Sequence, residues 1–341
     1  MSPVQADLTP ELLPLLDGVL HLAWVRDEAG ISGGACDADP DRARVRATGE
    51  YAQHVSHLSA RDTLLTRGDP GGLTTVEPAG TPSFTPMSWM VGSGARDGDP
   101  VAVPAQTVLL GWDPPPPEKR WCVQTSVGTA AGDDGAQAGT AALLEVIERH
   151  VLTRGWRTGD ILFERLDHLH EAVLPAGLLD ALRGHSVKLS TVRVAGIGLD
   201  VVLALLYRSG GEALTCGAAA KPSTAHAVRH AAYEAVATRL ALSRTRPSSA
   251  LQGRERARGL AVAAAGPAHL AFVEARTIGE GDLRDGPPAL PELADRLFGR
   301  QPAEVALPDA FGHVVRRVVC HRSEVFDPLT PSVDGLPCPV A

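Results

Sequence analysis

The sequence has few aromatic residues and no long apolar segment, and both shortages narrow the protein classes to consider. Phe, Trp and Tyr make up 4% of the 341 residues, so the core must be built mainly from Leu, Val and Ala. No run of about 18 apolar residues occurs, so no membrane span is expected. Residues 1–7 contain no basic stretch followed by an apolar core, and they predict no signal peptide.

Cysteine pairs and basic clusters are missing as well. The five cysteines lie far apart and form no Cys-x-x-Cys motif, which argues against a zinc ribbon or a dithiol redox centre. Unclustered cysteines in odd number are typical of a reducing compartment, and we expect a cytoplasmic protein. The formal net charge is -8 and no block of Lys or Arg stands out, so no dedicated nucleic-acid surface is expected.

Two common catalytic motifs are also absent. The Gly-containing segment 92–96 is not followed by Gly-Lys-Ser/Thr and is therefore a turn, not a P-loop. The Gly-x-Ser-x-Gly motif of the α/β-hydrolase nucleophile elbow does not occur. With 44% hydrophobic and 21% charged residues, the composition is that of an ordinary globular protein.

The sequence does contain helix and strand patterns, mixed without strict alternation. Helices are predicted at residues 9–24, 135–151 and 224–242, with a loop at 29–44. Strand patterns occur at residues 44–65 (leading into a helix), 101–112, 122–132, 187–207 (two strands), 213–217 and 312–320. This mixture favours an α+β fold over a doubly wound sheet. We divide the chain into an N-terminal helix and loop at residues 1–43 and one domain at residues 44–341.

The first group of candidate functional residues lies on and before the helix at 135–151. Glu145 and Glu148 are three residues apart and share a helix face, with Arg149 within ion-pair reach of Glu145. Buried carboxylates are costly without a cation, and their oxygens suit Mg²⁺ that carries nucleotide phosphates. Upstream, Gly128 would let the backbone approach a ligand closely, and Ser126 could contribute a hydroxyl. The alternative is a solvated helix face with an internal ion pair.

A second group lies on the helix at 224–242. His226, His230 and Glu234 are spaced four residues apart on one stripe, and Arg239 follows. Imidazoles and a carboxylate one turn apart can bind a transition metal. The alternative is an ordinary polar helix face.

The third candidate is the C-terminal segment. Pro337 and Pro339 form a conformationally restricted Pro-x-Pro close to the last residue. The alternative is a frayed chain end.

Together these motifs resemble the YcaO family. The segment Thr125-Ser126-Val127-Gly128 through Gly132, followed by Leu144-Glu145-Val146-Ile147-Glu148-Arg149, is similar to the ATP-binding signature of that family. The helix at 225–239 resembles the later ATP-site helix of the family, and the similarity extends from residue 44 to the C-terminus. It implies a YcaO-type α+β fold, in which mixed β-sheets and packed helices hold an ATP site between them.

The resemblance also implies cofactors and residue roles. ATP and Mg²⁺ are the expected cofactors, and Glu145 and Glu148 would bind the Mg²⁺. The residues expected to bind ATP are Ser126, Gly128, Arg149, Glu234 and Arg239. This division suits phosphoryl transfer, which depends on positioning and charge neutralisation. The terminal Pro337 and Pro339 would help to order the site, although Ala341 stands where azoline-forming members often have a third proline.

By resemblance, the expected function is an ATP-dependent cyclodehydratase that activates backbone amides of a ribosomally made precursor peptide to form azolines. Thioamide or amidine formation are alternatives within the family. Expected partners are the precursor peptide, a leader-binding protein and a second copy of the chain in a homodimer, with no nucleic acid and no membrane. An earlier Glu-x-x-Glu-Arg helix of the family matches residues 56–64, which have lost the two glutamates unless Asp62 substitutes from a shifted register. A catalytically degenerate YcaO-like scaffold subunit is therefore the second hypothesis.

Overall fold

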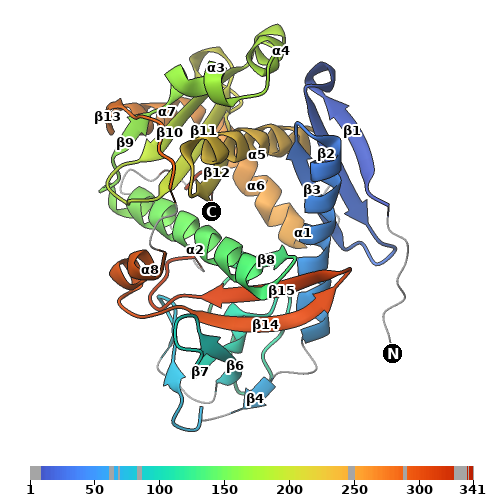
Figure 1. Cartoon of the computed structure of the whole chain (residues 1–341), viewed down its shortest axis with the longest axis vertical. Coiled ribbons are helices and arrows are strands. Elements are labelled where there is room, and N and C mark those ends of the chain that lie inside the picture. The colour runs from blue at the N-terminus through green and yellow to red at the C-terminus, as the bar shows by residue number, and fades with distance from the viewer. Residues whose placement is uncertain are drawn as a thin grey trace.

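The architecture combines three β-sheets with the helices packed on them (Figure 1). The structure is a computed structural model, and it describes residues 9–60, 65–67, 70–82, 87–244, 250–286, 290–325, 336 and 338–340. Mixed sheets with packed helices confirm the predicted α+β fold. None of the helices in these ranges is long and apolar enough to cross a lipid bilayer.

The described chain begins with a three-stranded antiparallel sheet instead of the predicted helix at 9–24. Strands β1 (Glu11–Leu15), β2 (Leu20–Arg26) and β3 (Ser32–Asp37) pair in sequence order. The helix prediction is wrong because Asp17 and Gly18 take positive φ angles of 58° and 87°, which interrupt the leucine-rich run and turn it into a hairpin.

Helix α1 (Pro40–Ala60) packs along β2 and β3. Gly33 of β3 is needed for this contact, because an added Cβ would lie 2.3 Å from the backbone nitrogen of Tyr51. The loop predicted at 29–44 is therefore wrong, as is the strand at the start of 44–65. The proposed boundary between residues 43 and 44 lies inside α1, and the division into domains stays a prediction.

A seven-stranded sheet forms the lower part of the molecule in Figure 1. Its order is β5-β7-β6-β14-β15-β8, and β4 also pairs with β6. The strands are β4 (Leu65–Arg67), β5 (Thr74–Thr75), β6 (Ser88–Gly94), β7 (Pro100–Pro104), β8 (Thr129–Gly132), β14 (Ala303–Ala310) and β15 (His313–Val319). The late strand at 312–320 is confirmed, whereas the segments 101–112 and 122–132 form strand over only part of their length.

A five-stranded sheet with the order β12-β11-β10-β9-β13 forms the upper part. Its strands are β9 (Phe163–Arg165), β10 (Lys188–Val194), β11 (Asp200–Tyr207), β12 (Thr215–Lys221) and β13 (Thr277–Glu280). The hairpin predicted at 187–207 is confirmed, with Gly196 and Gly198 at positive φ in its turn. Helix α5 (Thr224–Arg244) packs on β11 and β12, which confirms the helix predicted at 224–242.

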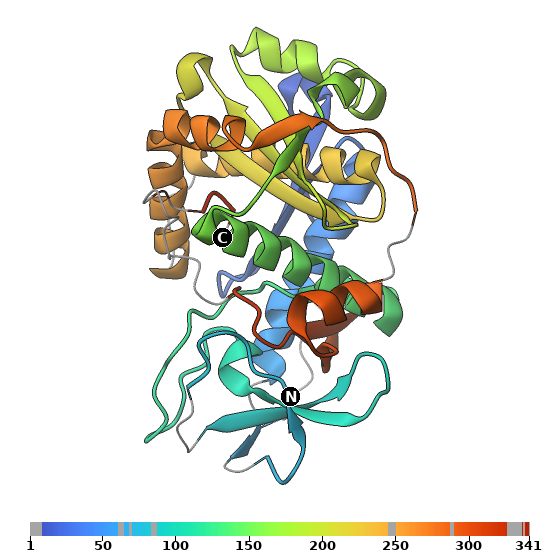
Figure 2. The same cartoon turned by 90° about the vertical axis from the view of Figure 1, so that its left-hand side faces the viewer.

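Helix α2 (Gly135–Thr158) lies between the two larger sheets, in contact with β8, β15 and β12 (Figures 1 and 2). Asp134 caps its N-terminus by accepting from the N–H of Gln137, and Gly159 ends it at a φ of 76°. The helix predicted at 135–151 is confirmed and continues for seven more residues. The remaining helices are α3 (His170–Val173), α4 (Leu178–Gly184), α6 (Ala250–Ala264), α7 (Gly266–Glu274) and α8 (Leu290–Phe298).

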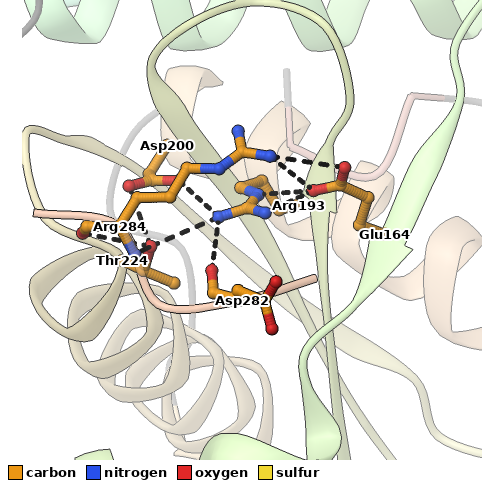
Figure 3. A network of polar contacts seen from close by, with 6 residues as sticks. All are labelled: Glu164, Arg193, Asp200, Thr224, Asp282 and Arg284. Atoms are coloured by element: carbon orange, nitrogen blue, oxygen red, sulfur yellow. Dashed lines mark hydrogen bonds and ion pairs between the residues drawn. The ribbon is translucent and has the colours of Figure 1, made fainter. Parts of the chain in front are cut away.

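A buried arginine joins the five-stranded sheet to the start of α5 (Figure 3). Arg193 of β10 is fully buried and pairs with Glu164 of β9 (Nε to Oε2, 2.8 Å) and Asp200 of β11 (Nη1 to Oδ1, 2.9 Å). It also donates to the carbonyl oxygen of Asp282 at 2.9 Å. The Thr224 hydroxyl, at the first residue of α5, donates to Asp200 at 2.9 Å. The network therefore fixes where α5 begins relative to the sheet.

Candidate functional site

The same hydrogen bond occurs at three of the strand-to-helix connections. In each case a glutamate on the helix accepts the backbone N–H of a residue in or next to the preceding strand, 16 or 17 residues earlier. The pairs are Glu50 with Gly34 (2.8 Å), Glu145 with Gly128 (3.0 Å) and Glu234 with Ala218 (3.0 Å). The helices α1, α2 and α5 thus each present a carboxylate held by main-chain atoms.

Arg149 brings the carboxylates of α2 and α5 together. Its Nε donates to Oε1 of Glu148 at 3.0 Å, and its Nη2 lies 3.5 Å from Oε1 of Glu234. The second oxygen of Glu148 accepts the N–H of Ala220 on β12 at 3.0 Å. Glu148, Arg149 and Glu234 therefore lie together, where the C-terminal end of β12 meets α2.

Glu145, Glu148 and Glu234, gathered around Arg149, are called the acidic cluster below. Burial shifts the pKa values of several of these groups. It raises the pKa of Glu145 to about 7, against the opposing effect of Arg149. Burial also raises the pKa of Glu234, although 42% of its side-chain surface still reaches solvent. Burial lowers the pKa of Arg149, but Glu148, Glu234 and Glu145 outweigh it, so the net shift is upward. The guanidinium therefore stays charged and holds the acidic side chains in place.

Two cations at this cluster were missed in the sequence. Lys221, the last residue of β12, interacts electrostatically with Glu148, Glu145 and Glu234. Arg46 of α1 interacts with both Lys221 and Glu234, while it donates to the carbonyl of Cys36 at 2.9 Å. Neither residue belongs to a recognisable motif, and only the packing of α1 and β12 beside α2 brings them here.

The C-terminal end of the chain lies at the same place. The Val340 carbonyl accepts a hydrogen bond from Nη1 of Arg149, and the C-terminus lies beside α2 in both views (Figures 1 and 2). Cys338 and Val340 are buried in the core cluster that includes α2. Pro339 belongs to a turn in this segment, whereas Pro337 lies outside the described residues. At residues 338–340 the frayed-end alternative is therefore wrong.

Of the other predicted ATP-binding residues, Gly128 contacts a carboxylate of the cluster, whereas Ser126 and Arg239 have other partners. Arg239 donates to the Ala213 carbonyl at 2.9 Å and has no contact with the carboxylates among the interactions of the described residues. The Ser126 carbonyl accepts the N–H of Thr129 at 2.8 Å in the loop before β8. The N–H of Gly128 is already bonded to Glu145, so Gly128 positions this carboxylate. An ATP-binding role for Ser126, Gly128 and Arg239 stays a prediction.

The histidine stripe on α5 is not a metal site in the described part of the chain. No three His, Cys, Asp or Glu side chains there are grouped to enclose a metal ion. His226 is exposed, and burial, with the charges of Arg46 and Lys221, lowers the pKa of His230 to about 2. The surroundings of His230 are therefore already cationic, which disfavours a metal ion.

The carboxylates of α2 and α5 nevertheless fit Mg²⁺ by their donor chemistry. Mg²⁺ usually takes one or two protein carboxylates together with water and substrate phosphates, and needs no complete protein cage. Glu145, Glu148 and Glu234 each place one oxygen on a backbone N–H. The second oxygens of Glu148 and Glu234 contact Arg149, and a carboxylate oxygen can accept from Arg149 and still bind a cation. This donor set therefore suits Mg²⁺ that arrives with a nucleotide.

Helix α1 differs from the sequence prediction at residues 56–64. Ser56 and His57 are fully buried, and Nε2 of His57 lies 2.9 Å from the Thr129 hydroxyl, so they are packing residues. Residues 61–64 lie outside the described part. Judged by the repeated hydrogen bond, Glu50 is the α1 counterpart of Glu145. Gln53 and His54 then take the places of Glu148 and Arg149, so α1 retains one carboxylate of the pair.

The family model described as YcaO cyclodehydratase, ATP- and Mg²⁺-binding, matches residues 75–318. No curated protein sequence matches the chain.

Solved structures of similar fold were also found. YcaO from Methanopyrus kandleri, bound with AMPPCP and Mg²⁺, is 21% identical with a TM-score of 0.64, over 93% of this chain and 86% of that one. A heterocyclase in complex with substrate and cofactor is 14% identical with a TM-score of 0.72, over 94% of this chain and 50% of that one. The E. coli microcin synthetase McbBCD complex contains a chain that is 13% identical with a TM-score of 0.63, over 94% of this chain and 89% of that one.

The family match spans well over half of the chain, and the three solved structures share its fold over 93–94% of its length. The predicted cofactors, ATP and Mg²⁺, are those of the matched family. The chain therefore belongs to the YcaO family of cyclodehydratases.

Proposed function

We propose that this protein is an ATP-dependent cyclodehydratase that forms azolines in a ribosomally made precursor peptide. The observation that carries the proposal is the convergence of Glu148 and Glu234 on Arg149, with the half-buried carboxylate of Glu145 and the C-terminal Val340 alongside. Heterocyclase and microcin synthetase chains with the same fold support azoline chemistry for this chain.

The proposed reaction converts one peptide amide at the expense of one ATP. The side-chain sulfur or oxygen of a Cys, Ser or Thr adds to the preceding amide carbon. The amide oxygen takes the γ-phosphoryl group, which releases ADP. Addition closes the five-membered ring and releases the proton of the thiol or hydroxyl. The C–O bond then breaks, inorganic phosphate leaves with that oxygen, the nitrogen loses its proton, and a C=N bond forms in the ring. Phosphoryl transfer of this kind depends mainly on positioning and on neutralising charge.

The residues of this chain supply the positioning. Glu145, Glu148 and Glu234 would hold the Mg²⁺ that shields the phosphate charges, each fixed by a backbone N–H. Arg149 keeps these acidic groups in register through its contacts to both helices. Its bond to the Val340 carbonyl ties the C-terminal segment to the same place. A precursor peptide and a leader-binding partner belong to the proposal, since McbBCD is a complex and has been solved with pro-MccB17 bound.

The test is phosphate release that depends on the peptide. The purified chain, combined with its precursor peptide and leader-binding partner, should release phosphate and lose 18 Da from the peptide for each ring, which is the mass of one water. The variant with Glu145→Gln and Glu148→Gln should do neither. A matched control, with Glu28→Gln and Glu171→Gln at exposed carboxylates of other elements, should keep both activities. Peptide-independent phosphate release alone would contradict the proposal.

One observation favours a second candidate, a scaffold subunit without catalysis. Helix α1 has Gln53 and His54 where α2 has Glu148 and Arg149, so one carboxylate of the expected pairs is missing. If the chain is only a scaffold, the assembled complex with the Glu145→Gln and Glu148→Gln variant will form product at the wild-type rate. The cyclodehydratase proposal expects no product from that complex.

A further inference from the structure

Lys221 occupies an unusual position for a lysine of this chain. The sequence contains three lysines, Lys119, Lys188 and Lys221, against 29 arginines. Lys119 and Lys188 are exposed, whereas Lys221 is half-buried at the end of β12. Lysine carries a compact charge on a flexible stem, whereas the arginine guanidinium is planar. A half-buried lysine in a chain whose cations are mostly arginines therefore indicates that this position needs a compact charge.

The backbone fixes Lys221 beside the acidic cluster. The residue before it, Ala220, donates its N–H to Glu148 at 3.0 Å, and Ala218 donates to Glu234 at 3.0 Å. Lys221 itself pairs in register with Asp200 of β11. The strand end is thereby held on two sides, against α2 and against the neighbouring strand.

The charges around Lys221 are of both signs. Burial lowers the pKa of Lys221 and Arg46 adds to this effect, whereas Glu148, Glu145 and Glu234 favour the ammonium form; the net shift is downward. None of the hydrogen bonds or ion pairs found in the described residues involves the Lys221 side chain, so its three donors are available. Three ammonium donors next to carboxylates suited to Mg²⁺ match the oxygens of a polyphosphate, which needs cations on more than one side.

We propose that Lys221 binds a phosphate group of the nucleotide from the β12 side, opposite the cation held by the glutamates. This proposal rests on the proposed function, because it assumes that nucleotide binds at Glu145 and Glu148. The ammonium would neutralise phosphate charge at the site, on a stem whose backbone is held at the end of β12.

The first experiment maps lysine accessibility in the wild-type chain. Acetic anhydride is added with and without Mg-ATP, and acetylation at the three lysines is read by mass spectrometry of one digest. Mg-ATP should reduce acetylation of Lys221 several-fold and leave that of Lys119 and Lys188 unchanged, so the other two lysines serve as internal controls. Equal labelling of Lys221 with and without saturating Mg-ATP would overturn the proposal.

The second experiment measures Mg-ATP affinity by calorimetry. Lys221→Met should weaken binding roughly 10- to 100-fold, the range for losing a hydrogen bond to a charged group. Lys221→Arg should recover part of the affinity, and Lys188→Met should bind like the wild type. Unchanged affinity in Lys221→Met would overturn the proposed role of Lys221 and leave the proposed function standing. If the wild type itself binds no Mg-ATP, the proposed function fails, which is a separate result.

Discussion

At the scale of single residues, each carboxylate of the acidic cluster has one oxygen that accepts a backbone N–H. Glu145 is half-buried near Arg149, and one of its carboxylate oxygens accepts the N–H of Gly128. Its pKa of about 7 lies far above the ordinary 4.5, because burial disfavours the ionised form. Binding of a cation needs the ionised form, so protons and metal compete for Glu145 near neutral pH.

This competition predicts the pH dependence of nucleotide binding. Since the free protein ionises Glu145 as pH rises through about 7, Mg-ATP affinity should increase from pH 6 to pH 8, roughly tenfold for one coupled proton. Calorimetry at both pH values would measure it. In Glu145→Gln the affinity should be low and lose this part of its pH dependence. An affinity that falls over the same interval would contradict the assignment.

Sequence reasoning located part of this cluster. Glu145, Glu148 and Arg149 lie on one helix, and the helical repeat was enough to group them. Lys221 and Arg46 come from a strand end and from another helix, and no spacing rule links residues that meet only through tertiary packing. The one-dimensional signal for Lys221 was its rarity, since it is one of three lysines.

At the scale of secondary-structure elements, the contact of α5 with β12 sets the position of Glu234. Gly217 allows this contact, because an added Cβ would lie 2.3 Å from the Ala231 carbonyl oxygen and 2.4 Å from the Ala235 nitrogen. Backbone atoms cannot move aside as a flexible side chain does. The helix itself would have to shift away from the strand.

We therefore predict that Gly217→Ala destabilises the protein by about 1–3 kcal/mol, the usual cost of overpacking. It should also weaken Mg-ATP binding, because Glu234 moves with α5. Gly184→Ala is the matched control, since nothing lies within 4 Å of an added Cβ there. Chemical denaturation of both variants gives the comparison. Equal stability of the two would show that the α5 contact is looser than the structure indicates.

The elements that sequence reasoning missed share a physical cause. The run at residues 9–24 has leucines at helical spacing, yet left-handed turn residues at its centre make it a hairpin. Helices α2 and α5 were predicted because each is a long run of helix-forming residues without proline. The short helix α4 and the strand β14 depend on the sheets that they contact, which local patterns do not report.

At the scale of the whole molecule, the Arg193 network joins three strands of the upper sheet to the start of α5 (Figure 3). Breaking a buried ion pair from one side leaves an uncompensated charge. Arg193→Met leaves Glu164 and Asp200 without this partner, so we expect a loss of about 3–5 kcal/mol in the free energy of unfolding.

The comparison for this prediction is an exposed pair. Arg183 and Asp180 are 2.9 Å apart, with 72% and 76% of their side chains exposed. Arg183→Met should change stability little, because water screens such pairs. Urea denaturation of the two variants tests the contrast. Similar stability of Arg193→Met and Arg183→Met would mean that the buried network is not what holds α5 to the sheet.

The central claim for the whole molecule is that Mg-ATP binds between α2, α5 and β12. The most direct measurement is the thermal midpoint with and without Mg-ATP, for the wild type, for Glu145→Gln with Glu148→Gln, and for the exposed control Glu28→Gln with Glu171→Gln. A ligand at 100 times its Kd adds about 2.7 kcal/mol of stability. We predict a midpoint increase of several degrees in the wild type and the control and none in the cluster variant. An equal increase in all three would place the nucleotide elsewhere and contradict the account.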